Sequence, residues 1–225
     1  MSDQSQKIIT IDGPAGAGKS TVAKQLAQKL DLSYLDTGAM YRALTLKAIR
    51  QNVDLEDEND LVDMARQTHI DLENHTTGIK VILDGNDVSE DIRTTEVTNK
   101  TFYVAQKPRV REIMVEWQRL LGSKRGVVVE GRDVGTVVFP QANNKFYLDA
   151  NINERSRRRI EELREKGNDV DADKLAIELK ERDNKDLTRS VGPLRKADDA
   201  VFIDSTHLTI DEVIEEMMKH INNDS

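Results

Sequence analysis

The chain has 225 residues, which is enough for one α/β domain with insertions or for a core that carries one small subdomain. It contains no cysteine, so disulfides and thiolate zinc sites are excluded. Its net charge of −8 disfavours a nucleic acid polymer as a partner, because the two would repel each other. The polar start and the lack of a membrane-length apolar run predict a cytoplasmic protein with no membrane partner, and we expect a monomer.

Short apolar runs, separated by helical patterns, predict the strands of one sheet. They are Ile8–Ile11, Leu32–Leu35, Val127–Val129, Phe146–Leu148 and Val201–Ile203. Continuous apolar strands that alternate with helices indicate a parallel sheet covered on both faces, hence an α/β three-layer sandwich. Asp12, Asp36 and Glu130 each follow one of these runs, and such strand-end polar residues collect in the ligand crevice.

A complete phosphate loop follows the first strand and precedes a helical segment. It reads Gly13-Pro14-Ala15-Gly16-Ala17-Gly18-Lys19-Ser20, followed by Thr21. Glycines let the backbone N–H groups point inward, and the helix that follows adds its dipole. We expect Lys19 to reach the outer phosphates of a nucleoside triphosphate and Ser20 to place its hydroxyl on Mg²⁺.

Two hairpin signals interrupt the alternation between about Ile70 and Arg93. Thr76-Thr77-Gly78 and Asp84-Gly85-Asn86 are turn sequences between short apolar stretches. They predict a small antiparallel sheet that forms a separate lobe and does not extend the parallel sheet.

Cationic residues gather in a few segments of this acidic chain. Asp36 to Arg42 follows the second strand, with Thr37 expected as a helix cap. Arg132 and Asp133 lie between glycines after the third strand, which is unusual for a purely structural turn. Local positive sites on an acidic protein suit a small phosphorylated ligand.

Two further charged segments have helical spacing. Arg155, Arg158 and Arg159 share one face of a helix that Asn151 and Glu154 cap and Gly167 ends, and this face is either a phosphate-covering lid or a solvated, salt-bridged surface. Arg182, Asp186 and Arg189 share another face, where a carboxylate held between arginines can bind a ribose hydroxyl. The capping-box pattern of Thr209 and Glu212 predicts the start of a final helix.

The guanine-reading Asn-Lys-x-Asp sequence of a switch GTPase is not met by Asn184 to Leu187, where leucine replaces the required aspartate. A small-molecule kinase fits the many cations, because phosphoryl transfer depends on positioning and charge neutralisation. Alternatives are a P-loop kinase for another substrate, such as shikimate or dephospho-coenzyme A, and a noncatalytic nucleotide-binding regulator.

Taken together, the motifs resemble those of bacterial cytidylate kinases, which are nucleoside monophosphate kinases. The resemblance covers nearly the whole chain and includes Ile11–Pro14, Leu35–Arg42, Asp91–Arg93, Pro108–Arg111, Gly131–Pro140, Lys180–Asp183 and Asp204–Thr206. It implies Mg²⁺-dependent phosphoryl transfer from ATP to CMP or dCMP. It also implies a P-loop core at 1–36 and 106–225 with a lid at about 154–168, and a monophosphate-binding region at 37–105 with the insert at about 70–93.

The resemblance also assigns roles to individual residues. Lys19, Arg132, Arg158 and Arg189 would be catalytic, and ATP would be bound by residues 13–21 and by Arg159. The acceptor CMP would be bound by Thr37, Arg42, Thr101, Arg111, Arg132, Asp133, Arg182, Asp186 and Arg189. Among these, Arg111 and Asp133 would read cytosine. The chain departs from the family at Phe102, where many relatives carry a serine, and Thr101 would substitute for it from the neighbouring position.

Overall fold

The computed structural model describes residues 7–75, 78–123, 126–165, 167 and 169–221. Its centre is a five-stranded sheet in the order β2-β6-β1-β7-β8, with all neighbouring strands parallel. The strands are β1 (Ile8–Asp12), β2 (Ser33–Asp36), β6 (Val127–Gly131), β7 (Asn144–Asp149) and β8 (Val201–Asp204). Each predicted run overlaps one of them, with Leu32 just before the start of β2, so the α/β fold class is confirmed.

Helices cover both faces of this sheet. The helices α1 (Lys19–Leu30) and α8 (Ile210–His220) pack on one face, and α2 (Thr37–Arg50) and α5 (Pro108–Gly122) pack on the other. On β6 the side chains of Val127 and Val129 enter the cluster with α2 and α5, whereas Val128 enters the cluster with α1 and α8. Both faces of the strand are therefore buried, which explains its uninterrupted apolar sequence.

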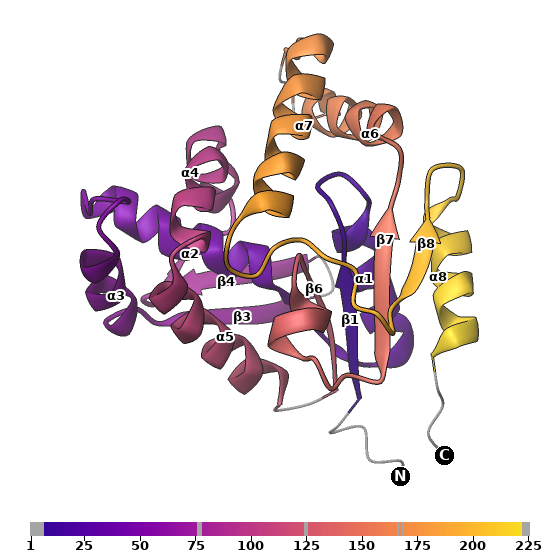
Figure 1. Cartoon of the computed structure of the whole chain (residues 1–225), viewed down its shortest axis with the longest axis horizontal. Helices are drawn as coiled ribbons and strands as arrows, with labels where there is room; N and C mark the ends of the chain where they lie inside the picture. The colour runs from indigo at the N-terminus through magenta and orange to yellow at the C-terminus, as the bar shows by residue number, and fades with distance from the viewer. Residues whose placement is uncertain (1–6, 76–77, 124–125, 166, 168, 222–225) are drawn as a thin grey trace.

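Beyond the carboxyl ends of the strands stand α6 (Ile152–Glu165) and α7 (Ala172–Thr188), which pack against each other (Figure 1). The other helices are α3 (Glu58–Arg66) and α4 (Thr95–Ala105), with short helical turns at Asp91–Arg93 and Val134–Val138. No helix in the described ranges is both long and apolar enough to cross a membrane.

The predicted insert is a separate antiparallel sheet of β3 (Ile70–His75), β4 (Gly78–Leu83) and β5 (Asn86–Asp87). Asp84 and Gly85, with φ of 49° and 83°, form the turn between β4 and β5, as the Asp-Gly signal predicts. Thr76 and Thr77 of the other predicted turn lie outside the described residues. The sheet does not extend the parallel sheet, but buried side chains such as Val81 belong to the same core cluster as those of α2.

The three predicted N-terminal helix caps are confirmed in one case, confirmed in part in another and wrong in the third. Thr209 and Glu212 form the expected reciprocal capping box of α8. Asn151 caps α6 by accepting from the Glu154 N–H at 2.8 Å. Glu154 does not return the bond of a capping box, because the Asn151 N–H donates to Thr206 and the Glu154 carboxylate pairs with arginines of α6. The expected cap of α2 was wrong, because the N-cap is Asp36, whose carboxylate accepts from the Ala39 N–H.

Candidate active site

The phosphate loop spans the gap between β1 and α1 and lies at the N-terminus of that helix. Its backbone runs so close to β7 that a Cβ on Gly13 would collide with the Leu148 carbonyl oxygen. Only glycine fits such an approach. The loop therefore presents backbone N–H groups and a helix N-terminus to the same space, which is the arrangement that binds phosphate.

Lys19 is buried in this loop, and no carboxylate in the described ranges bonds to it. Its Nζ donates to the Pro14 carbonyl oxygen at 2.7 Å. Burial, and then the positive charge of Arg132, lower the pKa of Lys19 to about 7. An anion placed here would reverse that shift, so the electrostatics of the loop favour a phosphate ligand.

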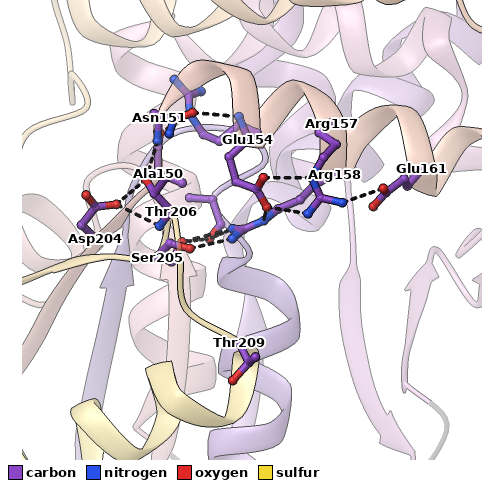
Figure 2. A network of polar contacts seen from close by, with 12 residues as sticks. Ala150, Asn151, Glu154, Arg157, Arg158, Glu161, Asp204, Ser205, Thr206 and Thr209 are labelled. Carbon is purple, nitrogen blue, oxygen red and sulfur yellow. Dashed lines mark hydrogen bonds and ion pairs between the residues drawn. The ribbon is translucent and has the colours of Figure 1, made fainter.

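The loop is held from outside by three side chains. Arg155 donates from Nη1 to the Ala15 carbonyl oxygen at 3.1 Å and pairs through the same nitrogen with Asp183 of α7 at 2.5 Å. Ser205 donates from Oγ to the Ala17 carbonyl oxygen at 3.2 Å. Figure 2 shows Arg158, whose guanidinium lies against Ser205 and Glu154. These contacts connect the loop to α6, α7 and the segment after β8.

Two buried carboxylates lie beneath the loop at the strand ends. Asp12 accepts from the backbone N–H groups of Val134 and Gly135 at 2.8 and 2.7 Å, and burial raises its pKa to about 6. Glu130 accepts from the Tyr34 hydroxyl and hydrogen-bonds with the Ser20 hydroxyl. Burial, and then the charge of Asp36, raise the pKa of Glu130. The sequence signal for Glu130 was its position directly after a strand.

The start of α2 carries two predicted site residues, Thr37 and Arg42, next to the carboxyl ends of β2 and β6. Thr37 is buried and donates from Oγ1 to the Glu130 carbonyl oxygen at 2.7 Å. Arg42 lies one turn further on and pairs with Asp36 at 3.0 Å. Burial tends to raise the pKa of Asp36, but Arg42 and the Ala39 N–H outweigh it and hold that pKa below its ordinary value.

The next group of cations joins the end of β6 to α7. Arg132 pairs through Nε with Asp186 at 2.7 Å. Burial, and then the charge of Arg132, lower the pKa of Arg182 to about 10. The charge of Asp186 opposes this shift, whereas those of Arg42 and Arg159 add to it. Within the described part of the chain, Arg182 has no ion pair of its own. Positive charge therefore exceeds negative charge at this point, as a phosphate site requires.

Arg111 and Asp133, the predicted cytosine readers, are brought together by the fold. They form a buried ion pair, and Arg189 pairs with the other oxygen of Asp133 at 3.3 Å. Burial raises the pKa of Asp133 even though three arginines oppose the shift. Gly192, with φ of 56°, covers the pair so closely that a Cβ there would collide with Arg111 and Asp133.

Four arginines of α6 have different environments. Arg157 is exposed and pairs with Glu154 and Glu161, so this position is a solvated, salt-bridged surface. Arg158 donates from Nε to Glu154 at 2.8 Å and from Nη2 to the Ser205 carbonyl oxygen at 2.6 Å. Arg159 pairs with Glu162 at 2.6 Å, and its charge acts on Arg182. Arg155, which shares their predicted face, is buried against the phosphate loop.

Thr101 and Phe102 lie on α4, across from α7. Thr101 donates from Oγ1 to the Val97 carbonyl oxygen at 2.7 Å, so its oxygen can still accept from a ligand. The Phe102 ring lies 5.7 Å from the Lys185 Nζ of α7. The assignment of Thr101 to the base stays a prediction.

Most of the predicted site residues therefore converge above the carboxyl ends of the parallel strands. Sequence reasoning missed the supporting roles of Arg155 and Ser205. Ser205 was part of a family motif, but no local signal showed that its hydroxyl would bond with the phosphate loop.

Comparisons with known proteins identify the family of this chain. The family model described as cytidylate kinase matches residues 9–223. The chain belongs to the cytidylate kinase family. It is therefore a nucleoside monophosphate kinase, which favours the interpretation as an enzyme over that as a noncatalytic regulator.

Several curated cytidylate kinases are similar over nearly their whole length. The protein of Desulforamulus reducens is 54% identical over 210 residues, which cover 92% of this chain and 93% of the relative. The protein of Bacillus subtilis is 48% identical over 217 residues, with 96% and 97% covered. An uncharacterised protein from Eubacterium ventriosum has a similar structure, with a TM-score of 0.51 at 14% identity, covering 96% of this chain and 98% of that one. This last likeness concerns the fold alone.

Proposed function

We propose that this family member transfers the terminal phosphoryl group of ATP to CMP or dCMP, giving ADP and CDP or dCDP. The observation that carries the proposal is that several positive charges lie close enough to affect one another. Burial and the charges of Arg132 and Arg182 lower the pKa of Lys19. Burial and the charges of Arg132, Arg42 and Arg159 lower the pKa of Arg182. Phosphoryl transfer is catalysed mainly by positioning and by neutralising charge on the phosphate oxygens. An acidic protein that concentrates cations at one point is suited to that chemistry.

On the donor side, the backbone of residues 13–21 would bind the phosphates of ATP, and Lys19 would neutralise charge on the transferred group. Ser20 fits a Mg²⁺ ion, because its exposed hydroxyl is an oxygen ligand held by the Glu130 carboxylate. The described residues contain no cluster of three or more metal-binding side chains, so phosphate oxygens would have to supply further ligands. Mg²⁺ would contribute charge neutralisation and orientation of the phosphates.

On the acceptor side, Thr37, Arg42 and Arg132 would hold the phosphate of CMP. Arg182 and Asp186 would bind the sugar, with Arg189 between the sugar and the phosphate. The base would be read by Arg111 and Asp133, since cytosine offers an exocyclic amine to a carboxylate and acceptor atoms to an arginine. Thr101 is proposed as a third base contact.

The helical pair α6 and α7 would act as the lid. Arg159 is the better candidate for direct contact with phosphate, because its charge already acts on Arg182. Arg158 would act in the lid by joining α6 to Ser205 beside the phosphate loop. Closure would exclude water, which competes with CMP as the acceptor.

An ADP-release assay tests the proposal. Purified protein, ATP and Mg²⁺ are combined in turn with CMP, dCMP, UMP, AMP, shikimate and dephospho-coenzyme A, with Lys19→Ala as the inactive control. We expect rapid ADP release with CMP and dCMP. A faster rate with shikimate or dephospho-coenzyme A would favour the alternative substrate class. Cytoplasmic localisation, a role in pyrimidine nucleotide metabolism, the monomeric state and the domain boundaries stay predictions.

A further inference from the structure

The hydroxyl of Tyr41 is buried on the acceptor side of the site and has no hydrogen-bond partner among the residues that the structure describes. Tyr41 lies on α2 directly before Arg42 and is 8% exposed. Among the described residues, its hydroxyl is one of the few buried side-chain oxygens left without a partner. A buried polar group in that state is costly, and each such group in a folded protein calls for an explanation.

None of the charged neighbours of Tyr41 in the described structure accepts a hydrogen bond from its hydroxyl. The Arg111 guanidinium lies 5.7 Å from the centre of the Tyr41 ring, and arginine has donors only. The two carboxylate oxygens of Asp133 are already paired, one with Arg111 and the other with Arg189. Arg111 also donates from Nη1 to the Ala105 carbonyl oxygen at 3.3 Å. The cluster is therefore complete without Tyr41, whose hydroxyl remains available to a ligand.

The position of the hydroxyl indicates which part of the ligand it meets. The charges that act most on Tyr41, after burial, are those of Arg111, Asp133 and Arg189, which stand at the base end of the proposed site. Burial raises the pKa of Tyr41 to about 12, so the hydroxyl keeps its proton at neutral pH and can act as a donor. Cytosine presents O2 and N3 as acceptor atoms, whereas Asp133 can take only the exocyclic amine.

We propose that Tyr41 is a further specificity-determining residue, which donates a hydrogen bond from its hydroxyl to an acceptor atom of the pyrimidine base. The ring of Tyr41 simultaneously supports the Arg111 guanidinium. The two contributions are separable, because phenylalanine keeps the ring and removes the hydroxyl. This inference rests on the proposed function, which the turnover of the unaltered enzyme with CMP tests by itself.

The test is the variant Tyr41→Phe, measured for stability and for kinetics. Because the hydroxyl has no partner in the free protein, we expect the melting temperature to stay the same or rise. The KM for CMP should rise roughly 3- to 10-fold, the loss expected for one hydrogen bond, while kcat and the KM for ATP change less than about 2-fold. Inhibition by cytidine, which has the base without the phosphate, should weaken by the same factor as the KM for CMP rises.

Two control variants separate this role from a structural one. Tyr34 is also buried, but its hydroxyl is bonded to Glu130, so Tyr34→Phe should lower the melting temperature. Tyr103 is exposed on α4, so Tyr103→Phe should change neither stability nor the KM for CMP. An unchanged KM for CMP in Tyr41→Phe would overturn the proposal. So would a lower melting temperature with equal weakening of both substrates, or a higher KM for CMP with unchanged inhibition by cytidine.

Discussion

Arg132 and Asp186 form a 2.7 Å ion pair that joins the loop after β6 to α7. Burial by itself would lower the pKa of Arg132, but the charge and hydrogen bond of Asp186 hold it above its ordinary value. Asp186 therefore stabilises the charge of Arg132, and Arg182, one turn earlier on α7, has no ion pair among the described residues. The excess positive charge that results is what we propose the two nucleotides neutralise.

Lys19 leads to a prediction about protons. Its pKa of about 7 lies below the ordinary value of 10.5, so between these pH values the free folded state binds fewer protons than the unfolded state. Burial of Lys19 therefore lowers the free energy of unfolding of the free protein. This loss has its full size below about pH 7 and decreases to zero as the pH rises toward 10.5. Bound phosphates would restore the charge. We expect binding of ATP at pH 8.5 to take up close to one proton, measured by calorimetry in buffers of different ionisation enthalpy.

Binding heats that do not depend on the buffer at pH 8.5 would contradict this assignment of Lys19.

The variant Lys19→Ala should remain folded but turn over much more slowly. We expect it to lose several kcal/mol of transition-state stabilisation, and each tenfold loss of rate corresponds to about 1.4 kcal/mol.

Asp133 should affect the acceptor more than the donor. Asp133→Ala removes the carboxylate between Arg111 and Arg189 and leaves two buried arginines without their partner. We expect the KM for CMP to rise by a factor that corresponds to about 1–3 kcal/mol, with a much smaller change in the KM for ATP. Steady-state kinetics with each substrate varied in turn provide the measurement. If both KM values rise equally, Asp133 has a structural role.

The arginines of α6 should differ from one another. Arg159→Ala should lower kcat without lowering the melting temperature, because its only ion pair in the described structure is with the partly exposed Glu162. Arg158→Ala should lower both kcat and the melting temperature, because it removes the hydrogen bonds to Glu154 and to the Ser205 carbonyl oxygen. Arg157→Ala removes only exposed ion pairs and serves as the control. Wild-type kinetics in Arg159→Ala at low and high salt would show that this arginine has no part in the lid.

Gly192 should tolerate no side chain. A Cβ there would collide with Arg111 and Asp133, and its φ of 56° adds backbone strain. Gly85 has a similar φ of 83° but open space around it, so the two variants share the strain and differ in the collision. We expect Gly192→Ala to raise the KM for CMP and lower stability, whereas Gly85→Ala lowers stability slightly and leaves kinetics unchanged. Equal kinetics in the two variants would show that the loop around Gly192 does not shape the base site.

The sequence was informative wherever one segment determined its own structure. The strands were predictable because their apolar runs are uninterrupted, and the Asp84-Gly85 turn because its backbone needs positive φ. The cap of α2 was missed because Asp36 and Thr37 are adjacent and both can cap a helix. The bond from Tyr34 to Glu130 joins residues 96 positions apart, and the buried role of Arg155 depends on α7. Helical spacing shows which residues share one face of α6, but it does not show which other element packs on that face.

The most direct test of the central claim follows the terminal phosphate of ATP. Protein is mixed with γ-³²P-labelled ATP, Mg²⁺ and CMP, and the products are separated chromatographically. We predict that the label appears in CDP in step with ADP formation, and that Arg132→Met, which removes the charge paired with Asp186, reduces the transfer by at least about 100-fold. Label released only as inorganic phosphate, at a rate that CMP does not change, would contradict the account.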